Sequence, residues 1–154
     1  MTHRPIVSFT KVSERALVPR YQTTGAAGAD LHAHLDQEVS IPAGGVKIVG
    51  TGIRIALPAD FEAQVRSRSG LAAKSHVFVL NSPGTIDADY RGEILVILCN
   101  ASQVPFRIQH GDRIAQLVVA PVVQARFEHN PHLDETERGS GGFGSTGISS
   151  GAGH

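Results

Sequence analysis

The chain lacks several features that would narrow its class at once. It has no tryptophan, one cysteine and one methionine, and only 5% of its 154 residues are aromatic. A single cysteine cannot form a disulfide framework within the chain, so the fold has to rest on an apolar core. A chain of this length can bury such a core as one domain, without a structural metal. We interpret Cys99, which ends the apolar run 94–99, as a small buried hydrophobic residue.

A surplus of charge and a long apolar run are also missing. Lys plus Arg equals Asp plus Glu, at 14 each. A nucleic-acid-binding protein generally needs a basic surplus, so we expect no nucleic-acid partner. No segment approaches the roughly 20 apolar residues of a membrane span, and the N-terminus has no apolar stretch like that of a signal peptide. We therefore expect a cytoplasmic protein with no membrane partner.

Short apolar runs separated by turn residues make up most of the chain. The segment 46–57 alternates apolar and other residues around two glycines, which predicts two short strands or one kinked strand. The run 93–100 is apolar over most of its length and predicts a strand buried on both faces. The run 113–123 predicts a similar strand, with Pro121 at an edge or bend. Many short strands with regular turns predict an all-β jelly roll or sandwich.

Helical signals are few, and the composition changes toward the C-terminus. The segment 70–74 predicts about one turn of helix, with Ser69 in the capping position. Residues 138–154 hold seven of the 17 glycines and few large apolar side chains. Burial of such a segment cannot offset its ordering entropy. We therefore expect one domain over residues 1–128 and a mobile, Gly-rich arm over residues 129–154.

Two short segments in the first half of the chain carry candidate binding residues. Asp30 stands beside an apolar residue, a pattern that a turn or a strand edge explains equally well. Arg68, Ser69 and Gly70 precede the predicted helical turn. A guanidinium, a hydroxyl and backbone N–H groups would converge there on one oxyanion. An ordinary turn with a solvated arginine is an equally good interpretation of that segment.

The richest segment is a hairpin-like stretch in the middle of the chain. Gly84 allows a tight bend and a close approach of the backbone to a ligand. Asn81 offers both a donor and an acceptor, which suits the edge of a pyrimidine. Asp87 is a candidate general base, and Tyr90 offers a flat wall for a sugar. Asn, Asp and Gly are also the usual residues of turns, so a purely structural interpretation exists.

Two further segments lie toward the C-terminus. Gln116 stands in an apolar strand and needs a hydrogen-bonding partner, for which a ligand phosphate and a backbone group are equal alternatives. The segment 138–147 has the spacing of a Walker A loop, but Ser145 occupies the lysine position. No strand precedes this segment and no helix is predicted after it, so a P-loop does not fit.

Five segments, taken together and in this order, resemble the five motifs of the trimeric dUTPase family: 27–31, 66–72, 79–93, 111–118 and 138–147. The resemblance spans most of the chain. It implies a distorted jelly roll with one very short helix, and a homotrimer with shared active sites. It also implies hydrolysis of dUTP to dUMP and pyrophosphate, which keeps uracil out of DNA and supplies dUMP for thymidylate synthesis. Ser67, where many relatives have proline, and Ala29, where a larger residue is common, depart from the pattern.

By this resemblance, three subunits contribute to each site. One subunit holds the triphosphate through Arg68, Ser69, Gly70 and Gln116. A second provides the contacts to uracil and deoxyribose: Asn81, Gly84, Thr85, Ile86, Tyr90 and Leu95. The third closes its arm, with Phe143 over the uracil and Arg138 on the γ-phosphate. Asp87 would activate water for in-line attack on the α-phosphorus, and Asp30 would hold a phosphate-chelated Mg²⁺ through water molecules.

A dCTP deaminase and a non-catalytic nucleotide-binding regulator are the two alternative functions. The dCTP deaminases resemble this sequence at the Ile86-Asp87 turn but use a glutamate on the following strand, which is apolar here over residues 94–98. A non-catalytic jelly-roll regulator would bind nucleotides and could dispense with Asp87. The presence of Asp87 with its neighbours favours the hydrolase.

Overall fold

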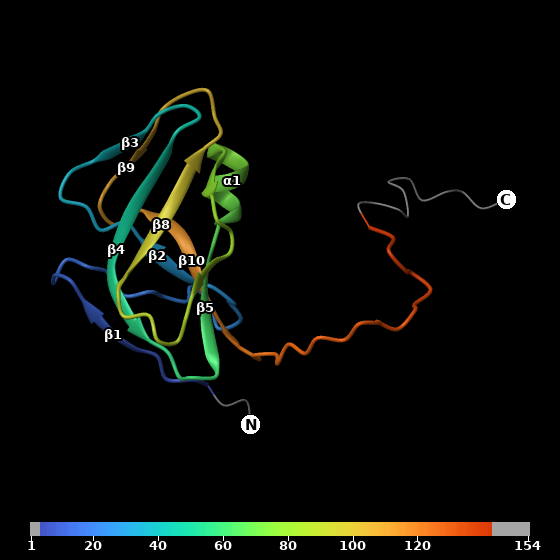
Figure 1. Ribbon diagram of the computed structural model, residues 1–154. Coiled ribbons are helices and arrows are strands. Elements are labelled where there is room, and N and C mark those ends of the chain that lie inside the picture. Colours follow the sequence, from blue (N-terminus) through green and yellow to red (C-terminus); the bar gives the residue numbers. More distant parts are fainter. Residues whose placement is uncertain (1–3, 143–154) are drawn as a thin grey trace. The chain divides into compact units, whose positions relative to one another are not determined.

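The computed structural model describes residues 4–142 of the chain. Over these residues the chain forms strands and one short helix (Figure 1), in the order β1 (Ser8–Lys11), β2 (Ala29–His32), β3 (Val39–Ile41), β4 (Val46–Ala56), β5 (Phe61–Arg66), α1 (Ser69–Ser75), β6 (Val77–Val79), β7 (Gly84–Ile86), β8 (Glu93–Asn100), β9 (Phe106–Ile108) and β10 (Arg113–Pro121). The predicted all-β jelly-roll class with one very short helix is confirmed. No helix of the described residues is long and apolar enough to cross a membrane.

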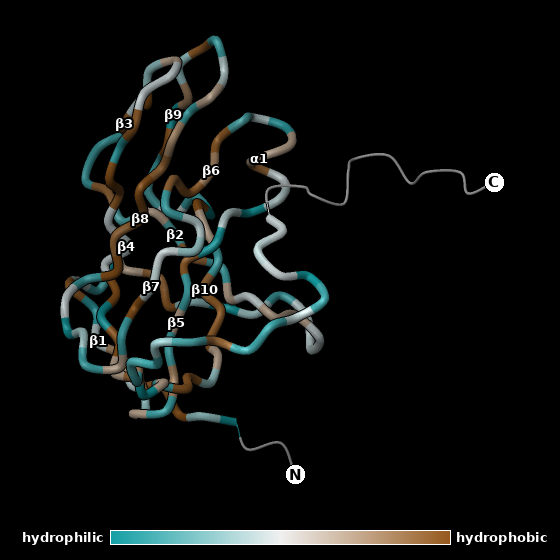
Figure 2. The backbone as a smooth tube through the Cα atoms, turned by 45° about the vertical axis from the view of Figure 1, so that its right-hand side comes forward, coloured by the Kyte–Doolittle hydropathy of each residue, from teal (hydrophilic) through white to brown (hydrophobic). Residues whose placement is uncertain are grey.

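Two four-stranded antiparallel sheets form the body of the fold. The strand orders are β1-β4-β8-β6 and β2-β10-β5-β7, and β3 pairs with β9 in a third, two-stranded sheet. Figure 2 shows that the apolar residues lie along strands such as β4, β8 and β10, whereas most connecting loops are polar. The buried side chains form one cluster that includes Leu31, Ile53, Val65, Val96, Leu98, Ile108 and Leu117. Val, Ile and Leu side chains at alternate strand positions therefore pack the two sheets against one common core.

Strand β4 is one long, kinked strand. Its register with β8 shifts between Gly50 and Arg54, which marks a β-bulge. Gly52 lies in this bulge with a φ of 70°, a conformation that residues with a Cβ atom rarely adopt. Of the two alternatives for the segment 46–57, the kinked single strand is therefore the correct one.

Strand β8 has the predicted bounds, but the prediction that both of its faces are buried is wrong for the single chain. Its even-numbered residues from Ile94 to Asn100 are buried. On the other face, Ile97 and Cys99 are half-buried and Leu95 is 50% exposed. One sheet face packs on the core, and no element of the described chain covers the other completely. Cys99, interpreted above as a small buried hydrophobic residue, is only half-buried in the single chain for the same reason.

Helix α1 starts one residue earlier than predicted. Arg68 is the N-cap residue, with an extended backbone, and no side chain caps the helix. The prediction that Ser69 caps the helix is therefore wrong, because Ser69 is the first helical residue. Its hydroxyl is exposed and is not used by a capping hydrogen bond.

The chain divides into two units after Val123. Residues 124–142 of the second unit contain no strand or helix. A turn at residues 137–140 is closed by a hydrogen bond from the Gly139 N–H to the Thr136 carbonyl, at 2.9 Å.

Candidate active site

A buried carboxylate lies at the centre of one cluster of predicted site residues. Asp30, on β2, is only 7% exposed. Its Oδ1 lies 3.2 Å from Nε of Arg68, and its Oδ2 lies 3.3 Å from Nη1 of Arg113. The Gln22 side chain also donates to Oδ2, at 2.9 Å. Two guanidinium groups and an amide thus compensate for the loss of water around this carboxylate.

Gln116 lies beside Asp30 in the sheet. The register of β10 places Gln116 opposite Asp30 on β2 and opposite Arg66 on β5. Its amide Nε2 donates to the Ser67 carbonyl at 2.9 Å, so the structure supplies the backbone partner that was one of the two alternatives. A Cβ atom at Gly28 would lie 2.3 Å from Gln116 Oε1, so a residue without a side chain is needed at that position.

The start of helix α1 is open next to this cluster. Arg68 donates from Nη1 to the Arg113 carbonyl at 3.2 Å, which adds to its ion pair with Asp30. Ser69 and Gly70 are exposed, and a Cβ atom at Gly70 would meet no atom within 4 Å. Arg68 and Arg113 also line one pocket of about 320 Å³. Guanidinium groups, a free hydroxyl and the first N–H groups of the helix make this region suitable for an anion.

The half-buried His32 next to this cluster was not predicted as a site residue. His32 ends β2 opposite Arg113. Burial lowers the pKa of His32 below its usual value of 6.5; Asp30 opposes this shift, and Arg113 and Arg68 add to it. Its Nδ1 is the one buried side-chain polar atom without a hydrogen-bond partner among the described residues.

The second cluster of predicted residues lies on and around β7. Asn81 is exposed, and its Nδ2 would lie 3.2 Å from a Cβ atom at Gly84, so the amide rests close to this glycine. Thr85 is exposed, whereas the Ile86 side chain is 6% exposed and belongs to the core. Ile86 can therefore offer a ligand its backbone but not its side chain. A hydrogen bond from the Leu80 N–H to the Ile97 carbonyl, at 2.8 Å, places this segment beside β8.

Asp87 and Tyr90 follow β7 in a tight turn. The Tyr90 N–H donates to the Asp87 carbonyl at 3.1 Å. Asp87 is exposed, and Tyr90 is 43% exposed. The Tyr90 hydroxyl donates to the Glu93 carbonyl at 3.0 Å, and its ring lies where a side chain at Gly92 would otherwise stand. The same turn thus carries a carboxylate accessible to water and an accessible aromatic ring.

Within one chain the two clusters lie apart. Strands β5 and β7 pair with Val65 opposite Gly84 and Ala63 opposite Ile86. Asp87 directly follows β7 and is therefore level with the start of β5, near Phe61. Arg68 follows the opposite end of β5. At roughly 3.3 Å per residue, about 13 Å of strand separates the level of Asp87 from the end of β5 that leads to Arg68. The single chain therefore brings Asp30, Arg68 and Gln116 together but does not bring Asp87 to them.

The remaining two predicted site residues, Arg138 and Phe143, belong to the C-terminal arm. Arg138 belongs to the second unit, where its Nε donates to the Gly141 carbonyl at 2.9 Å. Phe143 lies outside the described residues.

Three residues of the first cluster were missed from the sequence: Gln22, Gly28 and Arg113. Arg113 and Gly28 lie inside the recognised segments, so their positions in the motifs were the available signal. Gln22 lies outside them and gave none.

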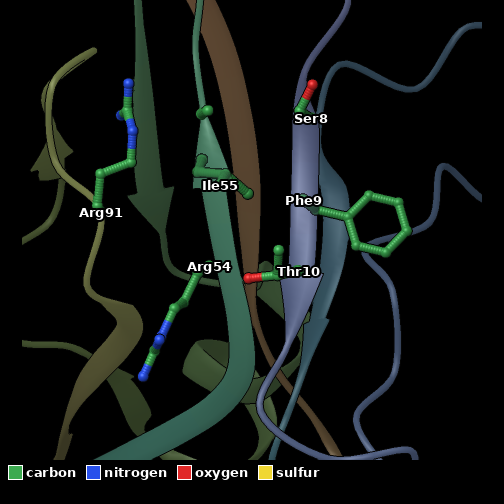
Figure 3. Close-up of a pocket in the computed structure, with 7 residues that line it drawn as sticks. Ser8, Phe9, Thr10, Arg54, Ile55 and Arg91 are labelled. Atoms are coloured by element: carbon green, nitrogen blue, oxygen red, sulfur yellow. The ribbon is translucent and has the colours of Figure 1, made fainter.

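A separate pocket of about 240 Å³ is lined mainly by residues of β1 and β4. Arg54 and Arg91 line it, and Figure 3 shows both guanidinium groups on the same side of β4, while the Phe9 ring points away from them. Arg91 donates from Nη1 to the Ala88 and Tyr90 carbonyls, at 2.7 and 3.0 Å. None of the predicted site residues lines this pocket, and the hydrogen bonds of Arg91 hold the turn that follows β7.

Comparison with known proteins places the chain in a family. The dUTPase family model matches residues 14–147. The chain is 57% identical over 137 residues to the deoxyuridine 5'-triphosphate nucleotidohydrolase of Maricaulis maris (strain MCS10), covering 88% of this chain and 90% of that protein. It is 54% identical to the enzyme of the same name from Helicobacter pylori (strain P12), covering 93% of this chain and 97% of that protein.

Solved structures show the same fold. A mutant dUTPase of Staphylococcus bacteriophage 80alpha, in complex with dUpNHpp, superposes with a TM-score of 0.85 at 23% identity, covering 93% of this chain and 99% of that one. A mutant dUTPase of phage phi11 of S. aureus, described with a structural Mg(II) ion, superposes with a TM-score of 0.76 at 20% identity, covering 84% and 99%. With a family model matched over most of its length and relatives this similar, the chain belongs to the dUTPase family.

Proposed function

We propose that this protein hydrolyses dUTP to dUMP and pyrophosphate. The observation that carries the proposal is the 57% identity, over 90% of its length, to a relative named deoxyuridine 5'-triphosphate nucleotidohydrolase. The geometry agrees with that activity, because one cluster offers cationic and N–H groups to a polyphosphate, and the turn in the other carries an accessible carboxylate and an accessible aromatic ring.

The triphosphate binds at the start of α1. Arg68 supplies a guanidinium, Ser69 a hydroxyl, and Gly70 an unobstructed backbone approach. Gln116 is fixed by its bond to the Ser67 carbonyl, so its amide is already oriented before a ligand arrives. Groups held in place in this way lose little entropy when the phosphates bind. Arg138 of the C-terminal arm supplies a further guanidinium to the γ-phosphate.

Magnesium fits the chemistry of this cluster. The described residues contain no group of three His, Cys, Asp or Glu side chains that would enclose a metal, and Mg²⁺ commonly binds through substrate phosphates and few protein oxygens. Asp30 is the carboxylate that lies at the phosphate subsite, 3.2 Å from Arg68, and it would hold the ion through water molecules. When bound, Mg²⁺ neutralises charge on the phosphates and so eases the departure of pyrophosphate.

The uracil and deoxyribose bind along β7 and the turn after it. Asn81 presents its amide to the pyrimidine edge, and the backbone around Gly84, Thr85, Ile86 and Leu95 supplies further donors and acceptors. Tyr90 packs against the deoxyribose, where its ring leaves no room for a 2′-hydroxyl. Phe143 covers the uracil when the arm, residues 129–154, closes over the site and excludes water.

The reaction is an in-line displacement at the α-phosphorus. Asp87 accepts a proton from a water molecule as the oxygen of that water forms a bond to the α-phosphorus. The bond from the α-phosphorus to the bridging oxygen breaks, and pyrophosphate leaves. Because Asp87 is exposed, water reaches its carboxylate without any rearrangement of the core.

The sites are shared between three copies of the chain. The separation of Asp87 from Arg68 along β5 and β7 supports this arrangement, since a single chain does not bring both groups to one nucleotide. An exposed apolar face also supports it. Val46 and Ile48 on β4 are 50% and 59% exposed, and they pair with Cys99 and Ile97 on β8. Apolar faces of this kind in globular proteins usually form interfaces.

A panel of four nucleotides tests the function. The protein, supplied with Mg²⁺, is incubated with dUTP, UTP, dTTP and dCTP, and the products are separated and identified. We expect turnover of dUTP only, with dUMP and pyrophosphate as products. Release of ammonia from dCTP at a rate comparable to dUTP cleavage would overturn the proposal in favour of a deaminase. Binding of dUTP without any product would favour a regulator.

A further inference from the structure

The carboxylate of Glu93 connects the turn that carries Asp87 to the β-bulge of β4. Glu93 is the first residue of β8 and lies opposite Arg54 in the register of the two strands. Its Oε1 accepts a hydrogen bond from the backbone N–H of Gly52 at 2.7 Å. The bulge leaves this N–H free of a strand partner, and the carboxylate supplies one.

The bulge is shaped to receive this carboxylate. A Cβ atom at Gly50 would lie 2.6 Å from Glu93 Oε1, so any side chain there would push the carboxylate away. The next residue of β8 is joined to the same bulge, because the Thr51 hydroxyl donates to the Ile94 carbonyl at 2.8 Å. Two successive residues of β8 are thus attached to one irregular stretch of β4.

The backbone carbonyl of Glu93 contacts the side chain of Tyr90. The Glu93 carbonyl accepts the hydrogen bond of the Tyr90 hydroxyl at 3.0 Å, and Gly92 leaves room for the tyrosine ring. The Tyr90 N–H in turn closes the turn by donating to the Asp87 carbonyl at 3.1 Å. A continuous chain of hydrogen bonds therefore runs from the bulge through Glu93 and Tyr90 to Asp87.

We propose that Glu93 is a positioning residue, whose carboxylate, seated on the Gly52 N–H, fixes the placement of Tyr90 and Asp87 for the reaction. The inference rests on the proposed function, in which Tyr90 selects deoxyribose and Asp87 activates water. In this role Glu93 contacts neither the substrate nor the attacking water. It acts through the hydrogen bond between its Oε1 and the Gly52 N–H on β4. What matters is that an acceptor oxygen lies at the correct distance from this N–H, not that the side chain is negatively charged.

Three substitutions at one position separate reach from charge. Glu93→Gln keeps an acceptor oxygen at the same reach and removes the charge. Glu93→Asp keeps the charge and shortens the side chain by one methylene, so the oxygen no longer reaches Gly52. Glu93→Ala removes both. Glu38→Ala is the matched control, because the Glu38 carboxylate also accepts a side-chain hydrogen bond, from Gln109 at 3.0 Å, and lies 3.8 Å from Nε of Arg107. Glu38 precedes β3 and Gln109 follows β9, so these contacts belong to the β3–β9 pair and not to β4 and β8.

The readouts are kcat and KM for dUTP and the ratio of kcat/KM for dUTP to that for UTP, with melting temperatures measured alongside. Wild type is measured first, since absence of dUTP turnover there rejects the proposed function and not this inference. We expect Glu93→Asp and Glu93→Ala to lower kcat by about tenfold to a hundredfold and to lower the ratio of kcat/KM for dUTP to that for UTP. Glu93→Gln and Glu38→Ala should keep both values near wild type.

Two results would overturn the inference. One is that wild type is active and that the Glu93→Asp and Glu93→Ala variants differ from it only in melting temperature. This result would mean that Glu93 has a purely structural role. The other is a Glu93→Gln protein as impaired as Glu93→Asp, which would mean that an acceptor with the right reach does not suffice without the negative charge. If Glu93→Ala does not fold, Gly50→Ala replaces it, because the added methyl group displaces the carboxylate while Glu93 is kept. The same loss of kcat and of the ratio is expected.

Discussion

The two acidic residues with proposed roles in the reaction have opposite surroundings. Asp30 is buried and contacts Arg68, Arg113 and Gln22, whereas Asp87 is exposed and its side chain has no hydrogen-bond partner among the described residues. A buried carboxylate that contacts two cations is held in one position, which suits a group that orients an ion or a phosphate. An exposed carboxylate is free to exchange a proton with water, which suits a general base.

Replacing Asp87 by asparagine should stop catalysis without disturbing the fold. The side chain is exposed, so its removal breaks no packing. We expect dUTP binding close to wild type and a fall of about 10² to 10⁴ in the rate of pyrophosphate release, the usual contribution of a general base. Binding is measured by calorimetry and product by a phosphate assay. Asp89→Asn, an exposed neighbour in the same turn, is the control and should stay active; near-normal turnover by Asp87→Asn would reject the proposed base.

His32 should make the folded protein sensitive to acid. Its pKa in the folded state is below 6.5 because burial disfavours the charged ring, so the unfolded chain binds more protons just below that pH. The free energy of unfolding should therefore decrease as pH falls through about 6.5 and level off below the pKa of the folded state.

Urea unfolding at pH 7.5 and pH 5.0, without nucleotide or divalent metal, measures this contribution. His32→Gln should lose less stability between the two pH values than wild type does, because the substituted residue cannot take up a proton. His129→Gln, at an exposed position, should behave like wild type. An equal loss in wild type and in His32→Gln would contradict the assignment to His32.

At the scale of elements, glycines allow strands to approach side chains closely at three places. Gly28 makes room for the Gln116 amide between β2 and β10, Gly50 for the Glu93 carboxylate between β4 and β8, and Gly92 for the Tyr90 ring. In each case the side chain that fills the space belongs to a predicted site residue or to the residue that positions one. The geometry of both clusters therefore depends on the strands around them as much as on the functional groups.

Replacing Gly28 by alanine should weaken nucleotide binding. The new methyl group would lie 2.3 Å from Gln116 Oε1 and 3.1 Å from Gln116 Cβ, so the amide must turn away from the Ser67 carbonyl. We expect KM for dUTP to rise about tenfold, and a stability loss of about 1–3 kcal/mol. Steady-state kinetics and urea unfolding measure the two effects. Gly25→Ala is the control, since a Cβ atom there meets nothing within 4 Å; equal KM values for both variants would argue against a role for the Gln116 amide.

At the scale of the whole molecule, the single chain has an uncovered apolar face and two separated clusters of candidate site residues. The outer face of β4 and β8 keeps Ile48 and Leu95 59% and 50% exposed. The groups proposed for phosphate binding and for water activation also lie at opposite ends of β5 and β7. Assembly of three copies would resolve both, because it would cover apolar surface and bring the clusters of different chains together.

Mixing two inactive variants tests the assembly. Asp87→Asn lacks the base but keeps the arm, and a chain truncated after Glu137 keeps Asp87 but lacks Arg138 and Phe143. Each variant alone should have severely reduced turnover. After subunit exchange, roughly a quarter of the sites in an equal mixture should hold a base from one variant and an arm from the other, and activity should return in part. No recovery after exchange has been demonstrated by mass spectrometry would contradict shared sites.

Local patterns in the sequence determined the strands and the turns, and they supplied the candidate site residues. Alternating apolar residues between Gly and Pro turns predicted the bounds of β8 and limited the segment of β4 to two short strands or one kinked strand, because strand pattern and turn chemistry are properties of neighbouring residues. The motifs named Asp30, Arg68 and Asp87 for the same reason, since each lies in a short recognisable segment.

Contacts between distant segments were decided only by the tertiary structure. The ion pair of Asp30 with Arg113 joins residues 83 positions apart, and the seat of Glu93 on Gly52 joins residues 41 apart. The exposed second face of β8 depends on which strands pack on it, and a strand's own residues do not specify this. These features arise from the pairing and register of whole strands, so no local pattern could have revealed them.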